Sequence, residues 1–367
     1  MVAVEEAQVK QAEAQTGLFA SLDTMGHEQV VYCSDPATGL KAIIGVHSTV
    51  LGPALGGCRF WHYQSEAEAL RDVLRLSRGM TLKNSIAGLN LGGGKAVVIG
   101  DPAKLKTTSF LRRLGQFVES LGGRYITAED VGMNTADMEI IHQTSTHVTG
   151  LPEAMGGSGD PSPFTAYGVF LGAKASAKRI WGTDSLAGKK VALQGAGHVG
   201  TYLARHLKEA GAKLFITDYY ENRAIELASE VGATVVGLDE IYDLDVDIYA
   251  PCALGGTLNS ENIDRLKCVI VNGAANNQLE DEIVHGRMLA ERGILYAPDF
   301  LINSGGVINV YQEILGYDRQ KSLEKVETIY DTLGHIFDQS AKEGITTHHA
   351  AMRIAMDRVE KARAIKA

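Results

Sequence analysis

Two lysines and an aspartate are placed where their chemistry could be combined. Lys95 follows three consecutive glycines and opens the apolar run 96–99, Lys83 lies near the end of a predicted helix, and Asp130 follows a strand-like segment that begins at 125. A partly desolvated lysine could act as a base, a second cation could bind a carboxylate, and an acid could move protons. This set suits an amino acid or 2-oxo acid substrate, although Lys95 alone could equally be a surface residue at the start of a strand.

Glycine, at 41 of 367 residues, is expected to serve backbone geometry at such sites. The glycines at 92–94 are expected to let a small ligand approach the Lys95 amine.

A second group of residues predicts a dinucleotide site. The pattern G-x-G-x-x-G lies between an apolar strand at 190–194 and a helix that begins at 198. In this context the first glycine permits a tight turn, the second admits a pyrophosphate, and the third lets helix and strand pack closely. The predicted cofactor-binding residues of this loop are Gly195, Ala196, Gly197, His198, Val199, Gly200 and Thr201.

Asp218 ends the next predicted strand, 23 residues after Gly195 (218 − 195). A carboxylate at this place is expected to hydrogen-bond a ribose 2′-hydroxyl and to repel a 2′-phosphate. Tyr219 and Tyr220 follow, and Arg223 is the nearest candidate for a phosphate clamp. The local chemistry therefore favours NAD over NADP.

The elements that must position these residues predict an α/β protein of two domains. An N-terminal α/β substrate-binding and oligomerisation domain is expected over 1–150, and a Rossmann-type dinucleotide-binding domain over 151–330. The segment 150–163, rich in glycine and proline, is the candidate hinge. C-terminal helices over 331–367 are expected to pack back toward the first domain, the second of them capped by Thr347.

The pattern of apolar residues predicts a series of strands and helices. In the second domain the alternation of strand and helix predicts a parallel sheet covered on both faces. The alanines and glycines of the helix at 165–181 predict close packing. Strands are expected at 29–33, 40–47, 95–99, 124–127, 190–194, 213–217, 234–236, 247–250, 269–272 and 294–297, and further helices from 65 and 134 and at 109–121, 198–211 and 222–231.

Composition excludes several classes of function. The chain carries 35 Lys plus Arg against 44 Asp plus Glu, a net charge of −9, and has no basic cluster. Nucleic acid and anionic membranes are therefore not expected as partners. The four cysteines lack metal or disulfide spacing, and neither a signal peptide nor a membrane span is evident, so a cytoplasmic protein is expected. His348 and His349 are expected at a solvated helix start rather than in a metal site, and Cys252 is expected to pack near the cofactor.

Longer motifs resemble those of the glutamate/leucine/phenylalanine/valine dehydrogenase family, and within it most closely the leucine dehydrogenases. The resemblance covers nearly the whole chain after the first ~20 residues. It implies reversible NAD-dependent oxidative deamination of an L-amino acid to its 2-oxo acid and ammonium, and a homo-oligomer, with an octamer favoured. The motifs are those at 51–57, 83–84, 88–95, 125–132, 247–255, 275–279 and 297–309.

The resemblance also implies roles for individual residues. Lys95 would activate the water that attacks the imine carbon, Asp130 would exchange protons with the substrate nitrogen, and Lys83 would hold the α-carboxylate. Asn277 would contact substrate and nicotinamide, and Thr149 would lie near the nicotinamide. No metal is required.

By the same resemblance the wall of the substrate pocket is apolar and offers no charge to a glutamate side chain. L-Leucine and other branched-chain amino acids are therefore the favoured substrates. Phenylalanine or valine dehydrogenase activity is the nearest alternative, a 2-hydroxy acid dehydrogenase or an NAD-binding regulator a more remote one. The wall residues are Leu55, Gly56, Ala128, Val307 and Val310.

Overall fold

The computed structural model describes residues 18–366. Contacts divide the chain into two compact units. The first comprises the chain up to Gly159 together with the residues from Met356 onward, and the second comprises Asp160–Ala355. The sequence predicts limits at 150 and 330 instead. Each unit is built around its own sheet. Among residues 18–366, no helix is long and apolar enough to cross a membrane.

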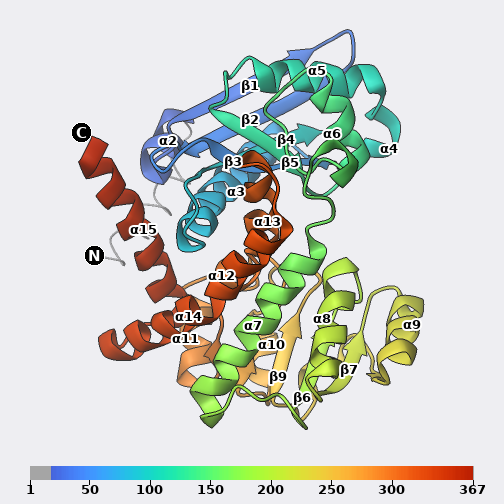
Figure 1. The fold of residues 1–367 in the computed structure, drawn as a ribbon, viewed down its shortest axis with the longest axis vertical. Helices are drawn as coiled ribbons and strands as arrows, with labels where there is room; N and C mark the ends of the chain where they lie inside the picture. Colours follow the sequence, from blue (N-terminus) through green and yellow to red (C-terminus); the bar gives the residue numbers. More distant parts are fainter. Residues whose placement is uncertain (1–17, 367) are drawn as a thin grey trace. The chain divides into compact units, whose positions relative to one another are not determined.

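The sheet of the first unit has five strands in the order β1-β2-β4-β3-β5 (Figure 1). β2 pairs antiparallel with β1 and with β4, whereas β3 is parallel to both of its neighbours, β4 and β5. The two central strands of the sheet, β4 and β3, therefore run in the same direction as β5. The strands are β1 (Gln29–Asp35), β2 (Leu40–Ser48), β3 (Ala54–Trp61), β4 (Gly92–Ile99) and β5 (Tyr125–Glu129).

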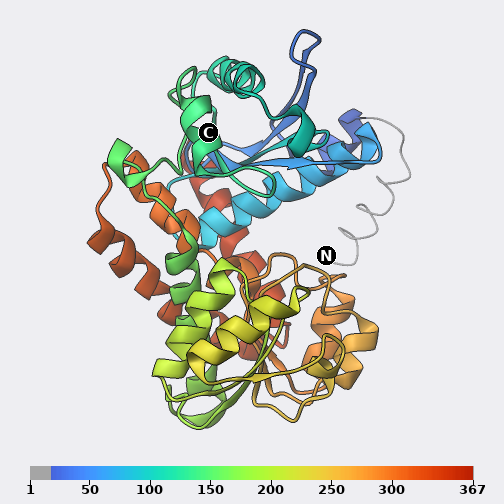
Figure 2. The ribbon, with the colours of Figure 1, turned by 90° about the vertical axis from the view of Figure 1, so that its right-hand side faces the viewer.

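Helices cover both faces of this sheet, as Figures 1 and 2 show. Alternate residues of β2 and β4 belong to two separate cores: Ile44 and Val98 pack with α5 and α6, and Ile43 and Val97 pack with α3. α3 starts after Ser65, whose hydroxyl accepts a hydrogen bond from the Glu68 amide, as expected for a helix N-cap. The helices are α2 (Leu18–Met25), α3 (Glu66–Ile86), α4 (Pro102–Leu105), α5 (Thr108–Glu119) and α6 (Thr135–His142).

The second unit contains a six-stranded parallel sheet in the order β11-β10-β9-β6-β7-β8. This is the strand order of a dinucleotide-binding fold, with the first strand, β6, beside the point where the order reverses. The predicted parallel sheet is confirmed. The strands are β6 (Lys190–Gln194), β7 (Lys213–Thr217), β8 (Thr234–Val235), β9 (Ile248–Pro251), β10 (Ile270–Val271) and β11 (Leu295–Tyr296).

Helices flank this sheet as well. Figure 1 shows α7 and α8 in front of the strands, and a buried cluster that includes Tyr249, Ile263 and Leu289 joins the strands to α10 and α11. α14 packs against α7. The helices are α7 (Ser162–Trp181), α8 (His198–Glu209), α9 (Glu221–Val231), α10 (Ser260–Arg265), α11 (Val284–Glu291), α12 (Asp299–Ile302), α13 (Gly305–Ile314), α14 (Arg319–Glu343) and α15 (Thr347–Lys366).

The close packing predicted for α7 is confirmed at two glycines. A methyl group on Gly168 would lie 2.6 Å from the Ile302 carbonyl oxygen, and one on Gly172 would lie 2.8 Å from Asn272 Oδ1. Side chains larger than hydrogen would therefore push α7 away from α12 and β10.

The end of α15 belongs to the first unit. Arg358 donates hydrogen bonds to the Leu89 carbonyl oxygen (2.6 Å) and to Asn90 Oδ1 (2.9 Å), and Lys366 donates one to the Val50 carbonyl oxygen (2.7 Å). The expectation that the C-terminal segment packs back toward the first domain is confirmed for this helix.

The start of α15 differs from the prediction in its cap. Thr346, not Thr347, accepts the hydrogen bond of the His349 amide (3.3 Å), while the Thr347 hydroxyl donates to the Tyr296 carbonyl oxygen (2.6 Å). Thr347 therefore ties the helix to the end of β11 instead of capping it.

His348 is buried, so the predicted solvated position is wrong for this residue. Only 5% of it is exposed, its ring contacts those of Tyr296 and Phe300, and Nε2 lies 3.4 Å from Glu282 Oε2. The helix begins against the body of the second unit, and packing overrides the polar character of the side chain.

Candidate active site

Lys95 and Asp130 meet at the centre of the first unit. Lys95 Nζ lies 3.0 Å from Asp130 Oδ2, and the lysine side chain is 7% exposed. Lys95 is the fourth residue of β4 rather than its first, because the strand begins at Gly92. Asp130 follows the last residue of β5. The expected convergence of these two residues is confirmed.

A glycine of β3 makes this convergence possible. Gly57 pairs with Ala128 of β5, and a methyl group on it would lie 2.5 Å from the Glu129 carbonyl oxygen and 2.9 Å from Asp130 Cβ. The pairing of β3 with β4 also lapses here, since it runs through Leu55 and resumes at Cys58. Gly57 thus lets the chain at Asp130 lie against β3, a role that sequence reasoning missed.

The glycines before Lys95 lie closely against other elements of the first unit. A methyl group on Gly93 would lie 2.6 Å from the Ser77 carbonyl oxygen of α3, and one on Gly94 would lie 2.7 Å from the Tyr125 ring. A methyl group on Gly92 would overlap the Ser48 carbonyl oxygen. These glycines therefore make room for neighbouring elements of the protein itself, and their role toward a ligand stays a prediction.

Arg59, which sequence reasoning also missed, completes the charge arrangement. Its Nε lies 2.9 Å from Asp130 Oδ2, and its Nη1 lies 3.1 Å from Asp72 Oδ2 on α3. Burial alone would raise the pKa of Asp130, but the charges of Lys95 and Arg59 outweigh burial and lower it from 3.8 to about 2. Asp130 is therefore a carboxylate at neutral pH.

The other residues predicted for the pocket wall and the nicotinamide in the first unit lie in β3 and β5 or are hydrogen-bonded to β5. Leu55 and Ala128 are buried in β3 and β5, and the Tyr125 hydroxyl donates to the Gly56 carbonyl oxygen (2.7 Å). Thr149 is buried, and its hydroxyl donates to the Thr127 carbonyl oxygen (3.1 Å).

Lys83 lies near the end of α3, one turn after Met80. Met80 Cγ would lie 3.2 Å from a methyl group on Gly56, so this face of the helix is directed at β3. The next residue, Asn84, is fully buried and donates to the Gly92 carbonyl oxygen (2.6 Å). α3 is thus fixed to the start of β4 beside Lys83.

The glycine loop of the second unit shows the geometry of a dinucleotide site. Gly195 has φ +112°, a methyl group on Gly197 would meet no atom within 4 Å, and one on Gly200 would overlap the Gly195 carbonyl oxygen. These are the tight turn, the open approach and the close helix packing that the three positions require. α8 begins at His198 without a side-chain cap, so its amide groups remain directed at the loop.

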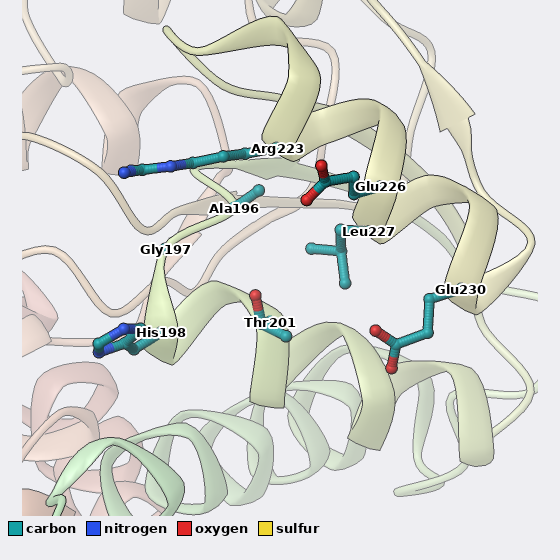
Figure 3. Close-up of a pocket in the computed structure, with 8 residues that line it drawn as sticks. All are labelled: Ala196, Gly197, His198, Thr201, Arg223, Glu226, Leu227 and Glu230. Carbon is teal, nitrogen blue, oxygen red and sulfur yellow. The ribbon is translucent and has the colours of Figure 1, made fainter.

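A pocket of about 520 Å³ adjoins this loop (Figure 3). Ala196, Gly197 and Thr201 line one side, and α9 lines the other with Arg223, whose guanidinium extends over the loop, and with acidic residues. The pocket residues are Ala196, Gly197, His198, Thr201, Arg223, Glu226, Leu227 and Glu230. Val199, within the same loop, belongs to the first turn of α8.

Asp218 fixes the loop from the end of β7. Its Oδ2 accepts from the Ala196 amide (2.7 Å), its Oδ1 accepts from the Tyr220 amide (2.8 Å), and Arg223 lies over the Tyr220 ring at 4.6 Å. The open face of Gly197, the helix N-terminus without a side-chain cap and a carboxylate in this place fit the dinucleotide of a nicotinamide cofactor.

Asn277 has a backbone conformation that sets it apart. Its φ is +51°, and among residues 18–366 no other non-glycine residue has a positive φ. The Gly256 amide donates to its carbonyl oxygen (2.8 Å), and the buried Asp299 accepts from the next amide, that of Gln278 (3.2 Å). Such strain is typical of functional sites.

The two valines predicted for the substrate pocket lie on α13 of the second unit, Val307 half-buried and Val310 buried. Cys252 lies beside the glycine loop, since a methyl group on Gly200 would be 3.9 Å from its Cβ, and burial raises the pKa of its thiol to about 12. Among residues 18–366 no group of three or more His, Cys, Asp or Glu side chains could hold a metal ion.

Comparisons with known proteins match nearly the whole chain to amino acid dehydrogenases of one family. The family model for the Glu/Leu/Phe/Val dehydrogenase dimerisation domain matches residues 27–147, and that for glutamate/leucine/phenylalanine/valine dehydrogenase matches 156–218 and 216–366. A leucine dehydrogenase of Thermoactinomyces intermedius is 54% identical over 346 residues, 94% of each chain. A valine dehydrogenase of Streptomyces virginiae is 49% identical, covering 96% of this chain and 99% of that one.

Among solved structures, the L-tryptophan dehydrogenase from Nostoc punctiforme matches with a TM-score of 0.82 and 48% sequence identity. The match covers 95% of this chain and 100% of that chain.

Proposed function

The chain belongs to the glutamate/leucine/phenylalanine/valine dehydrogenase family and is an amino acid dehydrogenase, and from this premise we propose that it catalyses the reversible, NAD-dependent oxidative deamination of L-leucine and other branched-chain L-amino acids. The observation that carries the proposal is the buried pair of Lys95 and Asp130, 3.0 Å apart beside Gly57. A base and a carboxylate in contact are what removal of an amino group requires.

Each charged residue has a separate task. Lys83 binds the α-carboxylate, and Asp130, ionised at neutral pH, accepts a hydrogen bond from the substrate nitrogen and exchanges protons with it. When bound, the nicotinamide ring accepts the hydride of the α-carbon, which leaves an imine on the substrate. Lys95 takes a proton from the water that attacks the imine carbon, and Asp130 returns a proton to the nitrogen as ammonium leaves. The product is the 2-oxo acid.

The cofactor would be held by the glycine loop. Gly197 would leave the space for the pyrophosphate, the amide groups at the start of α8 would face its charge, and Asp218, which accepts from the Ala196 amide, would hydrogen-bond the ribose 2′-hydroxyl. The negative charge of Asp218 supports NAD over NADP. Among the residues that line the pocket, Arg223 is the one lysine or arginine that could bind a 2′-phosphate instead. A comparison of kcat/KM with NADH and NADPH tests this choice, and equal values would contradict it.

The choice of substrate rests on apolar residues. Leu55 and Ala128 are buried in the first unit, and Val307 and Val310 lie on α13. None could neutralise a second carboxylate, which supports an aliphatic over an acidic side chain. Because a methylene in an apolar pocket discriminates by only about 1–3 kcal/mol, valine and isoleucine should react as well. The relatives named leucine, valine and tryptophan dehydrogenase define the panel to be compared.

A homo-oligomer, with eight subunits as the expected number, and a cytoplasmic location complete the proposal. The match of residues 27–147 to a dimerisation domain supports the first. The four cysteines, all free thiols, support the second, since cytoplasmic proteins are kept reduced. Light scattering of the purified protein would give the subunit number.

One assay tests the reaction itself. NADH oxidation is followed with 4-methyl-2-oxopentanoate in the presence and absence of ammonium, and then with the 2-oxo acids of valine, phenylalanine, tryptophan and glutamate. We expect ammonium-dependent turnover that is fastest with the branched-chain acids. Turnover without ammonium would indicate a 2-hydroxy acid dehydrogenase, and no turnover with any 2-oxo acid would indicate an NAD-binding protein of another kind. Either result would contradict the proposal.

A further inference from the structure

We propose that Arg59 is a positioning residue of this reaction, which holds the carboxylate of Asp130 in one orientation between β4 and α3. The inference rests on the proposed function, because it concerns the reaction in which Asp130 takes part. Arg59 would not touch the substrate itself, so its effect is exerted through Asp130.

Arg59 makes contact with two carboxylates through two different nitrogens. Nε lies 2.9 Å from Asp130 Oδ2, and Nη1 lies 3.1 Å from Asp72 Oδ2. The Arg59 side chain is 24% exposed, and the side chains of Asp72 and Asp130 are 15% and 21% exposed. A planar guanidinium is suited to two such contacts because its donors are fixed in direction.

Asp72 is in turn held in place by a neutral donor. The Tyr63 hydroxyl, in the loop after β3, donates to Asp72 Oδ2 (2.6 Å). Burial and the adjacent carboxylate raise the pKa of Tyr63 far above its usual range, so it remains protonated. The chain of contacts from Tyr63 through Asp72 and Arg59 therefore anchors Asp130 to α3, the helix that also carries Lys83.

Both cations bind the same oxygen of Asp130. Lys95 Nζ at 3.0 Å and Arg59 Nε at 2.9 Å lie on Oδ2, and they come from neighbouring strands, β4 and β3. With Oδ2 fixed from two directions, the carboxylate cannot rotate freely, and Oδ1 is the oxygen left to face the substrate nitrogen.

The balance of charge points the same way. Lys95 and Arg59 face Asp130 and Asp72, so the four charges cancel. Without Arg59, Lys95 would still face Asp130, and Asp72 would keep the neutral Tyr63 hydroxyl and the charge of Arg75 at 3.8 Å, whose side chain is 64% exposed. Exposed pairs of this kind are weak. Asp130 would then both turn more freely and take up a proton more easily.

Besides the charged Lys95, Arg59 and Asp72, two other titratable groups near Asp130 stay neutral in the pH range of an assay. Cys58 lies beside Arg59 in β3 and Tyr125 lies in β5; burial raises the pKa of Cys58 to about 12 and raises that of Tyr125 well above 10. A shift in the pH dependence on removal of Arg59 is therefore to be ascribed to the loss of its charge beside Asp130 and the ion-pair partner of Asp130, Lys95.

The test compares the wild type with Arg59→Gln, Arg59→Lys and the matched control Arg75→Gln, which removes the other arginine near Asp72. We expect Arg59→Gln to lower kcat by about 10²-fold, within the range of a misplaced proton-transfer group. The acidic limb of its kcat/KM profile should move to higher pH, and added guanidinium at millimolar concentration should restore part of the rate. Arg59→Lys should keep the charge but lose one of the two contacts, so its kcat and its pH profile should lie between those of the wild type and Arg59→Gln. Arg75→Gln should resemble the wild type.

Three results would overturn the inference. The first is an Arg59→Gln enzyme with an unchanged rate and pH profile. The second is a loss of rate without a change in the pH profile and without rescue, which would show a merely structural role. NADH binding, measured by fluorescence, and thermal unfolding show whether each variant is folded. If Arg59→Gln is not folded, the rate and pH profile of Arg59→Lys are compared with those of the wild type instead. The third is a wild type inactive with ammonium and every 2-oxo acid, which would overturn the proposed function as well, whereas the first two leave it standing.

Discussion

Gly57 lies directly against Asp130: a methyl group in place of its hydrogen would be 2.9 Å from Asp130 Cβ and 2.5 Å from the Glu129 carbonyl oxygen. This close approach brings the carboxylate to within 3.0 Å of Lys95. The geometry of the proposed site thus depends on a residue without a side chain.

Gly57→Ala should therefore impair both activity and stability. The methyl group would displace the chain at Asp130, so we expect kcat to fall at least tenfold and the free energy of unfolding to fall by about 1–3 kcal/mol. Gly79→Ala in α3 is the matched control, because a methyl group there meets no atom within 4 Å. That variant should be stabilised by about 0.5–1 kcal/mol and keep its activity. Urea denaturation and the NADH assay measure both, and an unimpaired Gly57→Ala would contradict the geometry.

Lys95→Met should abolish most of the turnover. A general base contributes about 10²–10⁴-fold, and the loss should appear in kcat while NADH binding is retained. Lys174→Met is a control for the loss of an ion pair, since Lys174 Nζ lies 3.0 Å from Asp184 in the second unit. A Lys95→Met enzyme with most of its activity would remove this residue from the mechanism.

The second and third glycines of the cofactor loop should respond differently to the same substitution. A methyl group on Gly197 meets no atom, so Gly197→Ala should fold normally but bind NADH more weakly because it fills the cofactor's space. A methyl group on Gly200 would overlap the Gly195 carbonyl oxygen, so Gly200→Ala should lower the melting temperature as well. NADH fluorescence titration and thermal unfolding distinguish the two. Equal losses of stability would contradict this assignment.

Asn277 should be needed for its side chain and not only for its backbone. At φ +51°, Asn277→Gly relieves strain and should preserve or raise stability, whereas Asn277→Ala should lose about 1 kcal/mol. If the amide contacts substrate and nicotinamide, both variants should lose activity to the same extent. Retention of activity by the glycine variant alone would show that only the backbone conformation matters.

His47 should make stability depend on pH. Burial, followed by repulsion from His27, lowers its pKa from 6.5 to about 3. Nδ1 lies 2.7 Å from the Thr81 hydroxyl and Nε2 lies 3.0 Å from the Met25 carbonyl oxygen, an arrangement that suits the neutral ring. The unfolded chain binds the proton below pH 6.5 and the folded chain does not, so stability falls as the pH falls from about 6.5 toward 3.

The expected slope is about 1.4 kcal/mol for each pH unit within that window. In His47→Gln this part of the slope should disappear, while His335→Gln, at an exposed position of α14, should keep it. Urea denaturation between pH 4 and pH 7 makes the comparison. A parallel pH dependence of wild type and His47→Gln would show that His47 does not contribute.

The sequence predicts best those elements whose local signals agree. β6 and β7 have the predicted bounds, and the start of α3 is as expected because Ser65 and Glu68 form a recognisable N-terminal pattern. β3 was missed, since its two central glycines weaken the strand signal and its burial on both sides removes any alternation. Its partners lie far along the chain, so only the folded sheet reveals it.

The candidate site could be predicted only where its residues belong to local sequence motifs. Lys95, Asp130 and the glycine loop stand at strand ends within recognisable motifs, but Arg59 is distinguished only by what it touches, Asp130 and Asp72. At Gly92–Gly94 the sequence shows that space is needed, but only the folded structure shows that α3, β2 and Tyr125 take it up. His348 was misplaced because nothing local indicates that α15 starts against Tyr296.

The central place of β3 has a consequence for synthesis on the ribosome. Ala54 pairs with Gly92 and Tyr125, so this strand leaves the ribosome 38 residues before its first partner (92 − 54) and 71 before its second (125 − 54). Until then it is an unpaired apolar segment, the kind of species that aggregates or engages chaperones. Yield during expression should therefore be most sensitive to changes that slow the emergence of residues 92–129, even where they leave the finished enzyme unaltered.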